Sequence, residues 1–140
     1  MSVHIEAQLA ELWKHAADSI PEWLPTQFIE WLPLAYETAR LFTPKRNGRS
    51  NIYLVLLDYR DTHPGSLGVY VGMTSHTPQL RFEQHKAGIR AAGSVLKRGL
   101  ELLAGPTAHL QGIPRADAAN IEEQLAEALR ARGLLVQGGH

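Results

Sequence analysis

The chain has 140 residues, with 14 basic and 14 acidic side chains and no cysteine. This length is enough for one domain with a hydrophobic core. The lack of cysteine excludes disulfide scaffolds, thiol-based zinc sites and thiol catalysis. The first 20 residues lack the apolar core of a signal peptide, and no apolar run approaches the ~18 residues that span a membrane. We therefore expect a soluble, cytoplasmic protein.

The net charge of zero hides an uneven distribution of charge along the chain. Residues 1–42 hold six acidic and two basic side chains, whereas residues 81–100 hold five basic side chains and one acidic residue, Glu83. A local excess of basic charge attracts a polyanion even when the whole protein is neutral. Because most charge runs are simply solvated helix faces, this distribution favours a nucleic-acid partner without establishing one.

Two amphipathic stretches open the chain. Residues 3–20 and 26–42 place apolar side chains at helical spacing, and Pro33 predicts a kink or a broken start in the second stretch. The segment "TPKRNGRS", 43–50, is a polar and basic connector. We predict that residues 1–50 form a helical extension and connector. This part of the chain holds all three tryptophans as well as the two apolar stripes, so we expect the stripes to pack on the rest of the chain or to form a homo-oligomer with a second copy.

The pattern then changes to short strands. The runs "NIYLVLLDY", 51–59, and "LGVYVGMT", 67–74, are apolar, and the loop between them predicts an antiparallel hairpin. The next segment begins a helix, with Thr77 as the N-cap and Pro78 at the first helical position.

The last third of the chain gives both clear and ambiguous signals. Residues 94–106 are compatible with a short helix or with a third strand, and "TAHLQGI", 107–113, is a candidate strand. Residues 115–133 predict a strong helix that stops at Gly133. The final "LLVQGGH", 134–140, is a short strand or a tail.

Four pieces in this order resemble the GIY-YIG endonuclease family. "NIY" at 51–53 is followed by "YVG" at 70–72, by Arg-x-x-x-His in the helical "LRFEQH", and by a later helix with glutamate. The resemblance covers roughly residues 51–137. It implies a small α/β (α+β) domain over residues 51–140, in which helices flank a central three-stranded antiparallel sheet, with residues 1–50 outside it.

The resemblance also implies roles for five side chains. Tyr53, Tyr70, Arg81 and His85 take the positions of catalytic residues, and Glu122 takes the position of the metal ligand. The implied cofactor is Mg²⁺ or another divalent cation such as Mn²⁺, and the implied activity is hydrolysis of phosphodiester bonds in DNA. The alternative is a non-catalytic module of the same fold that binds nucleic acid or protein.

Elementary chemistry is compatible with these roles. Phosphodiester cleavage needs a cation on the phosphate and stabilisation of the charge that builds up. Arg81 and His85 are four residues apart, so both lie on one helix face and could reach one phosphate. A tyrosine with its reference pKa of about 10 is a poor base unless a metal, arginine or histidine lowers that pKa. His85 could take the proton onward.

Helical periodicity chooses between two adjacent glutamates. Ile121, Leu125 and Leu129 define the apolar stripe of the last helix, and Glu122 lies along this stripe. Glu123 points toward the solvent-type face. A carboxylate buried without a partner costs several kcal/mol, and a metal ion is one such partner. Glu122 is therefore the predicted ligand, although an ion pair with Arg81 would be another explanation for it.

Taken one at a time, the same residues have ordinary structural explanations. Tyr53 and Tyr70 lie in apolar strands, where tyrosine usually belongs to the core, and an isolated His85 would be a surface histidine. Two departures from the family pattern bear on turnover. Asn51 replaces the usual glycine of the first motif, and the C-terminal asparagine of many members is missing, with only Gln137 in that region.

The nucleic-acid contact is predicted on the basic central segment. Its candidate residues, which act together with the basic connector at 45–49, are Lys86, Arg90, Lys97 and Arg98. Contacts of this kind go to phosphates and carry no sequence specificity.

Overall fold

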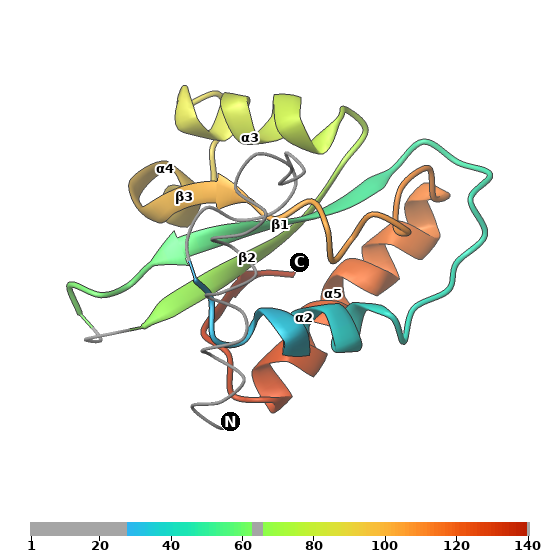
Figure 1. Ribbon diagram of the computed structural model, residues 1–140. Coiled ribbons are helices and arrows are strands. Elements are labelled where there is room, and N and C mark those ends of the chain that lie inside the picture. The colour runs from blue at the N-terminus through green and yellow to red at the C-terminus, as the bar shows by residue number, and fades with distance from the viewer. Residues whose placement is uncertain (1–27, 63–65, 140) are drawn as a thin grey trace, which may run out of the picture.

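The computed structural model describes residues 28–62 and 66–139 as one four-stranded sheet with helices on both of its faces (Figure 1). The strands are β1 (Asn51–Asp58), β2 (Leu67–Thr74), β3 (Gly99–Leu102) and β4 (Val136–Gly138), and the helices are α2 (Leu32–Ala39), α3 (Pro78–Lys86), α4 (Gly93–Arg98) and α5 (Arg115–Ala131). The expected mixture of helices and strands is confirmed. The helix expected over residues 3–20 lies outside the described residues. None of the described helices has the length and hydropathy needed to cross a lipid bilayer.

The sheet differs from the three antiparallel strands that we expected. Its order is β3-β1-β2-β4, with β1 antiparallel to both of its neighbours and β4 parallel to β2. The fourth strand forms because the chain reverses after α5 at Gly133, whose φ is +91°. The reversal brings Val136 opposite Val69. The final residues are therefore an edge strand, and the expectation of a wholly antiparallel sheet was wrong.

Strand β1 lies in the middle of the sheet and is buried on both faces. A strand in this position reads as a continuous apolar run and not as an alternating one. Its antiparallel register with β2 places Tyr53 opposite Gly72 and Val55 opposite Tyr70. The predicted hairpin is thus confirmed, and the two motif tyrosines are diagonal neighbours across it.

Two apolar clusters fill the space on either side of the sheet. Helices α2 and α5 cover one face, and α3 and α4 cover the other (Figure 1). The larger cluster, on the α2/α5 face, takes Ile52, Leu54 and Leu56 from β1. The smaller cluster, on the α3/α4 face, takes Tyr53 and Val55. Successive residues of one strand therefore supply the two faces in alternation.

The described part of the N-terminal extension packs on the rest of the chain. Helix α2 has Pro33 in its first turn, where a missing N–H leaves no bond unmade. The predicted broken start is confirmed. Ala35 and Ala39 are fully buried in the larger cluster. Just before the helix, Trp31 Nε1 donates a hydrogen bond of 2.8 Å to the carbonyl of Leu67.

The start of α3 agrees with its sequence signals. Thr77 is the N-cap, and its Oγ1 accepts a hydrogen bond of 3.1 Å from Leu80 N–H. Pro78 is the first residue of the helix. Both features place α3 directly after the loop that leaves β2.

Residues 94–106 form both a short helix and a strand, the two structures that the sequence allowed, whereas residues 107–113 do not form the expected strand. The first part contains most of helix α4 and then strand β3, which pairs with β1. The candidate strand at 107–113 is wrong. Leu110 N–H bonds back to the carbonyl of Thr107, and Gly112 has a φ of +69°. These turns curl the segment, so only Ile113 makes a β-bridge, to Ser50.

Candidate functional site

Three aromatic side chains from three elements meet on the α3/α4 face. The ring centroids of Tyr53 and Tyr70 are 6.0 Å apart, and that of His85 lies 6.0 Å from Tyr53 and 5.6 Å from Tyr70. The cluster depends on Gly72, because a Cβ there would overlap Cζ and Oη of Tyr53. The glycine of the "YVG" motif thus lets the Tyr53 ring lie across β2.

A directed hydrogen bond fixes the tautomer of His85. The backbone N–H of Ala92 donates to His85 Nδ1 over 3.0 Å, so Nδ1 carries no proton. The proton of the neutral ring is therefore on Nε2, which lies 2.8 Å from Tyr53 Oη. His85 Nε2–H donates, and the Tyr53 oxygen accepts.

The hydroxyl of Tyr53 then directs its own proton toward Tyr70. Burial first, and then this hydrogen bond and the charge of Tyr70, raise the pKa of Tyr53. The same bond lowers the pKa of Tyr70. Burial and the charge of Glu122 outweigh this effect, so the pKa of Tyr70 is raised overall. Because the Tyr53 oxygen already accepts from His85, its own proton is free to bond to Tyr70, and we assign Tyr53 as donor and Tyr70 as acceptor. The hydrogen-bond chain therefore runs Ala92, His85, Tyr53, Tyr70.

The two tyrosines differ in access to solvent. Tyr53 is 2 % exposed and uses its hydroxyl as both acceptor and donor. Tyr70 is half-buried and stands at the end of the chain, with its own proton still to donate. An incoming molecule can meet Tyr70, whereas Tyr53 supports it from behind.

His85 is buried and is not the surface histidine that it would be as an isolated residue. Only 1 % of it is exposed, and burial, with the positive charge of Arg81, lowers its pKa to about 4. Both ring nitrogens are already engaged, one by Ala92 and one by Tyr53. The ring can accept a proton only by releasing Ala92. His85 therefore has no free ring nitrogen with which to play the expected role of onward proton acceptor.

Arg81 lies on the same helix as His85, and its guanidinium donates hydrogen bonds to backbone carbonyls. Nη1 donates to the carbonyl of Ile89 over 3.1 Å, and Nη2 donates to the carbonyl of Arg90 over 2.8 Å. Among the described residues it makes no ion pair with Glu122, so that alternative fails. Its charge still acts on the pKa values of Tyr53, Tyr70 and His85.

Glu122 bonds to the edge of β2 at Met73, just beyond the residues that pair with β4. Along this edge Val69 N–H bonds to Leu135, the Val71 carbonyl accepts from Gly139, and Met73 N–H bonds to the Glu122 carboxylate. Burial raises the pKa of Glu122 to about 7, against the lowering effect of the Met73 bond.

The burial pattern of α5 agrees with the choice between the two glutamates. Glu122 is 6 % exposed, and Glu123 is exposed. Periodicity alone therefore identified the buried carboxylate. Whether it binds a metal stays a prediction.

The carboxylate of Glu122 fits a magnesium ion held by one protein ligand. Within residues 28–62 and 66–139, its Oε1 is buried and has no hydrogen-bond partner. No group of three or more His, Cys, Asp or Glu side chains surrounds it in that part of the chain. Mg²⁺ is commonly bound through one or two carboxylates plus waters and substrate phosphates. The charge of this carboxylate also raises the pKa values of Tyr53 and Tyr70.

The four predicted nucleic-acid contacts separate into two pairs. Lys86 Nζ bonds to the carbonyls of Leu96 and Gly99, and Arg98 Nη1 lies 2.6 Å from Asp61 Oδ1. Arg98 also stacks over the Tyr59 ring, 4.5 Å from its centroid. These side chains already stabilise the fold.

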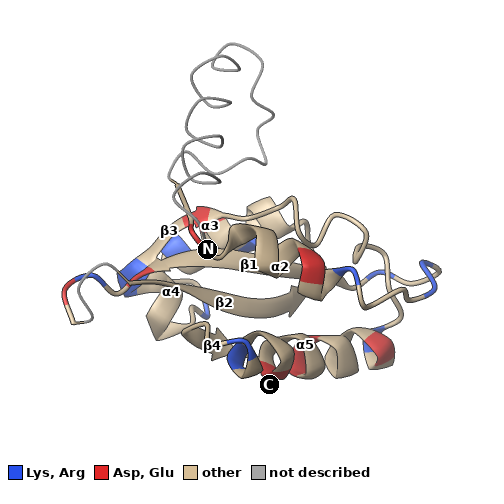
Figure 2. Ribbon diagram, turned by 60° about the horizontal axis from the view of Figure 1, so that its bottom comes forward, with Lys and Arg blue, Asp and Glu red and all other residues tan. Residues whose placement is uncertain are grey.

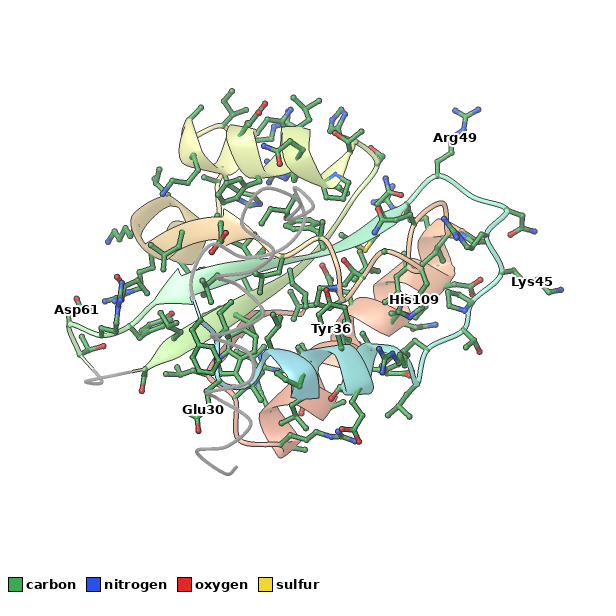
Figure 3. The ribbon with its side chains drawn as sticks, viewed as in Figure 1. Glu30, Tyr36, Lys45, Arg49, Asp61 and His109 are labelled. Carbon is green, nitrogen blue, oxygen red and sulfur yellow. The ribbon has the colours of Figure 1, made fainter. Side chains whose placement is uncertain are left out.

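The other pair, Arg90 and Lys97, makes no side-chain hydrogen bond or ion pair to any described residue. Lysine and arginine residues lie toward both ends of the sheet (Figure 2). Lys45 and Arg49 project outward from the connector, at the end opposite Asp61 (Figure 3). A single polymer reaching all predicted cations would have to span the sheet.

One cavity lies apart from these residues. A volume of about 800 Å³ opens between α2 and the end of α5, lined by apolar side chains such as Trp31, Leu34 and Leu134. None of the five predicted site residues lines it. The candidate site is therefore separate from this cavity.

Sequence reasoning missed two features of the site. The backbone N–H of Ala92 has no side-chain signature, so nothing in the sequence could reveal it. Asn51, the departure from the family motif, bridges two loops: its Nδ2 donates to the His76 carbonyl, and its Oδ1 accepts from Gly112 N–H. The replaced glycine therefore has a structural explanation.

No family model matches the chain, and no curated protein or solved structure is significantly similar to it. The resemblance to the GIY-YIG family consequently depends on the four sequence pieces. Their geometry is the basis for the proposal that follows.

Proposed function

We propose that the protein is a divalent-metal-dependent endonuclease of the GIY-YIG type that hydrolyses phosphodiester bonds in DNA. One observation carries this proposal. A half-buried tyrosine hydroxyl ends a hydrogen-bond chain, and its pKa is raised by the charge of Glu122, a carboxylate with an unpartnered, buried oxygen. Protein interiors rarely leave such an oxygen unsatisfied, so a cation is a reasonable partner for it.

The proposed roles follow from exposure and hydrogen bonding. Glu122 holds the cation, which when bound would offset the negative charge of a phosphate. Tyr70 meets the attacking water, because Tyr53 is buried and its hydroxyl is fully engaged. Tyr53 donates to the Tyr70 oxygen, and this bond stabilises the deprotonated form of Tyr70. His85 holds the direction of that bond.

Neutralising Glu122 would further favour the base form of Tyr70. The carboxylate charge is one of the causes that raise the Tyr70 pKa. A positive ion held by Glu122 removes that cause. Arg81 acts in the same direction through its charge, while its guanidinium holds the turn after α3.

A specific observation also favours the non-catalytic alternative. Both tyrosine pKa values are raised, and the Arg81 guanidinium is bound to backbone carbonyls instead of facing a free surface. A module that binds nucleic acid without cleaving it would have the same features. The two proposals differ in one measurable property, which is turnover.

The test is nicking of supercoiled plasmid with Mg²⁺ or Mn²⁺, together with DNA binding measured separately in Ca²⁺. We expect Glu122→Ala to abolish cleavage and to spare binding. The matched control Glu123→Ala, one residue away and exposed, should cleave normally. Tyr70→Phe should reduce the rate by about 10²–10⁴-fold, the usual range for loss of a general base.

The outcomes separate the alternatives. Wild-type protein that binds DNA but stays inactive with every cation would make the non-catalytic module the better proposal. Activity that survives Glu122→Ala and disappears with Glu123→Ala would reject the assigned metal ligand.

A further inference from the structure

The turn that follows α3 has an unusual backbone. Arg90 has a φ of +46°, and among the described residues it is the only non-glycine residue with positive φ. The left-handed region strains a residue that has a Cβ, because the Cβ approaches the following carbonyl oxygen. Such a conformation persists only where the surrounding structure holds it, and it is frequent at functional sites.

Several bonds hold this turn in place. Arg81 donates to the carbonyls of both Ile89 and Arg90, and Ile89 N–H bonds to the carbonyl of Gln84 over 2.9 Å. On the far side, Ala92 N–H donates to His85. The turn is therefore anchored before and after its tip. An anchored element loses little conformational entropy when it binds a partner.

The side chains at the tip do not serve the fold. Ile89 is 55 % exposed, and Arg90 is exposed with no described side-chain partner. A glycine at position 90 would adopt the same backbone without strain. Ala92, which follows, packs against the smaller apolar cluster. The turn is thus needed to bring Ala92 to His85. That purpose requires neither an exposed isoleucine at position 89 nor a strained arginine at position 90.

The charge around the tip restricts the kind of partner. Residues 84–100 contain four basic side chains and no acidic one. An exposed aliphatic side chain beside an unpaired arginine fits a polyanion that has an apolar interior. Stacked bases between two phosphate strands have this chemistry, and proteins that bend DNA insert aliphatic side chains between base steps.

We infer that the Ile89–Arg90 tip is a DNA-inserting element, with Ile89 wedged into a base step and Arg90 on the adjacent phosphate. The inference rests on the proposed function and extends it, because the tip is anchored to the residues that position Tyr53 and Tyr70. The element would distort the duplex next to the bond that is cut. Arg81 then acts as a positioning residue for the tip.

The test uses a duplex with 2-aminopurine at successive positions, bound in Ca²⁺. Wild-type protein should raise the fluorescence at one step, because an unstacked 2-aminopurine is brighter. Ile89→Ala should remove the increase and weaken binding severalfold, because alanine is too short to hold a base step apart. Ile89→Leu should keep both. Leu41→Ala, which alters another exposed aliphatic residue, should change neither.

A second pair of variants separates charge from backbone. Arg90→Asn tolerates positive φ but removes the charge, so the slope of log binding constant against log salt should fall by about one. Arg90→Lys should keep the slope. Wild-type protein that binds no DNA would overturn both the proposed function and this inference. DNA binding and cleavage with unchanged fluorescence, or a silent Ile89→Ala, would overturn the inference alone.

Discussion

The two faces of the sheet are built from the same strand but depend on different interactions. On the α2/α5 face, Ile52, Leu54 and Leu56 are fully buried among apolar side chains. On the α3/α4 face, Tyr53 occupies the alternate row and uses its hydroxyl in two directional bonds. Apolar packing tolerates changes of shape better than a hydrogen-bond chain tolerates loss of a donor or an acceptor. The first face sets stability, and the second sets the geometry of the candidate site.

The largest effect should come from the apolar face. Leu54→Ala creates a cavity where the side chain is fully buried, and we expect a loss of about 2–5 kcal/mol in the free energy of unfolding. Leu41→Ala removes the same atoms from a residue that is 67 % exposed. It should change the free energy of unfolding by less than about 0.5 kcal/mol. Urea unfolding measures both. Similar losses in the two variants would contradict the assignment of the main core to this face.

The next effect concerns pH and belongs to the site face. The pKa of His85 falls from 6.5 in the unfolded chain to about 4 in the folded one, because burial disfavours the charged ring. A lowered histidine pKa gives stability that is fully present above 6.5 and is lost as the pH falls toward 4. We expect wild-type protein to lose about 2–3 kcal/mol over this interval through His85.

The matched variant is His85→Gln, which has no titrating ring and whose amide can donate to Tyr53. Its unfolding free energy should fall less steeply between pH 6.5 and 4. Glu122 has a raised pKa and contributes in the opposite sense in the same interval, but it is present in both proteins and cancels in the comparison. Parallel pH profiles would show that His85 is not held neutral.

Local sequence signals predicted much of both faces. The hairpin follows from two apolar runs, and the start of α3 follows from Thr77 and Pro78. Periodicity placed Glu122 on the buried face of α5 and Glu123 on the exposed one. Each of these features depends on residues within a few turns or one loop of each other.

What the sequence did not reveal depends on distant contacts. Strand β4 pairs with β2 only because the whole of α5 returns the chain to that edge. The tautomer of His85 depends on the backbone N–H of Ala92, a group that every residue except proline carries. The segment at 107–113 has strand-like composition but is held in turns that bond to the start of β1.

The smallest effect, and the sharpest test of the difference between the faces, is a coupling energy. If Tyr53 donates to Tyr70, then Tyr70→Phe should destabilise the protein less once Tyr53→Phe has removed the donor. We expect a coupling of about 1 kcal/mol between these two substitutions, measured by a double-mutant cycle in urea. Tyr53→Phe combined with Ile52→Val should be additive within about 0.5 kcal/mol. Those two side chains are neighbours in sequence but lie on opposite faces and in separate clusters. An additive tyrosine pair would mean that the hydrogen-bond chain ends at Tyr53, and Tyr70 would then lose its proposed support as a base.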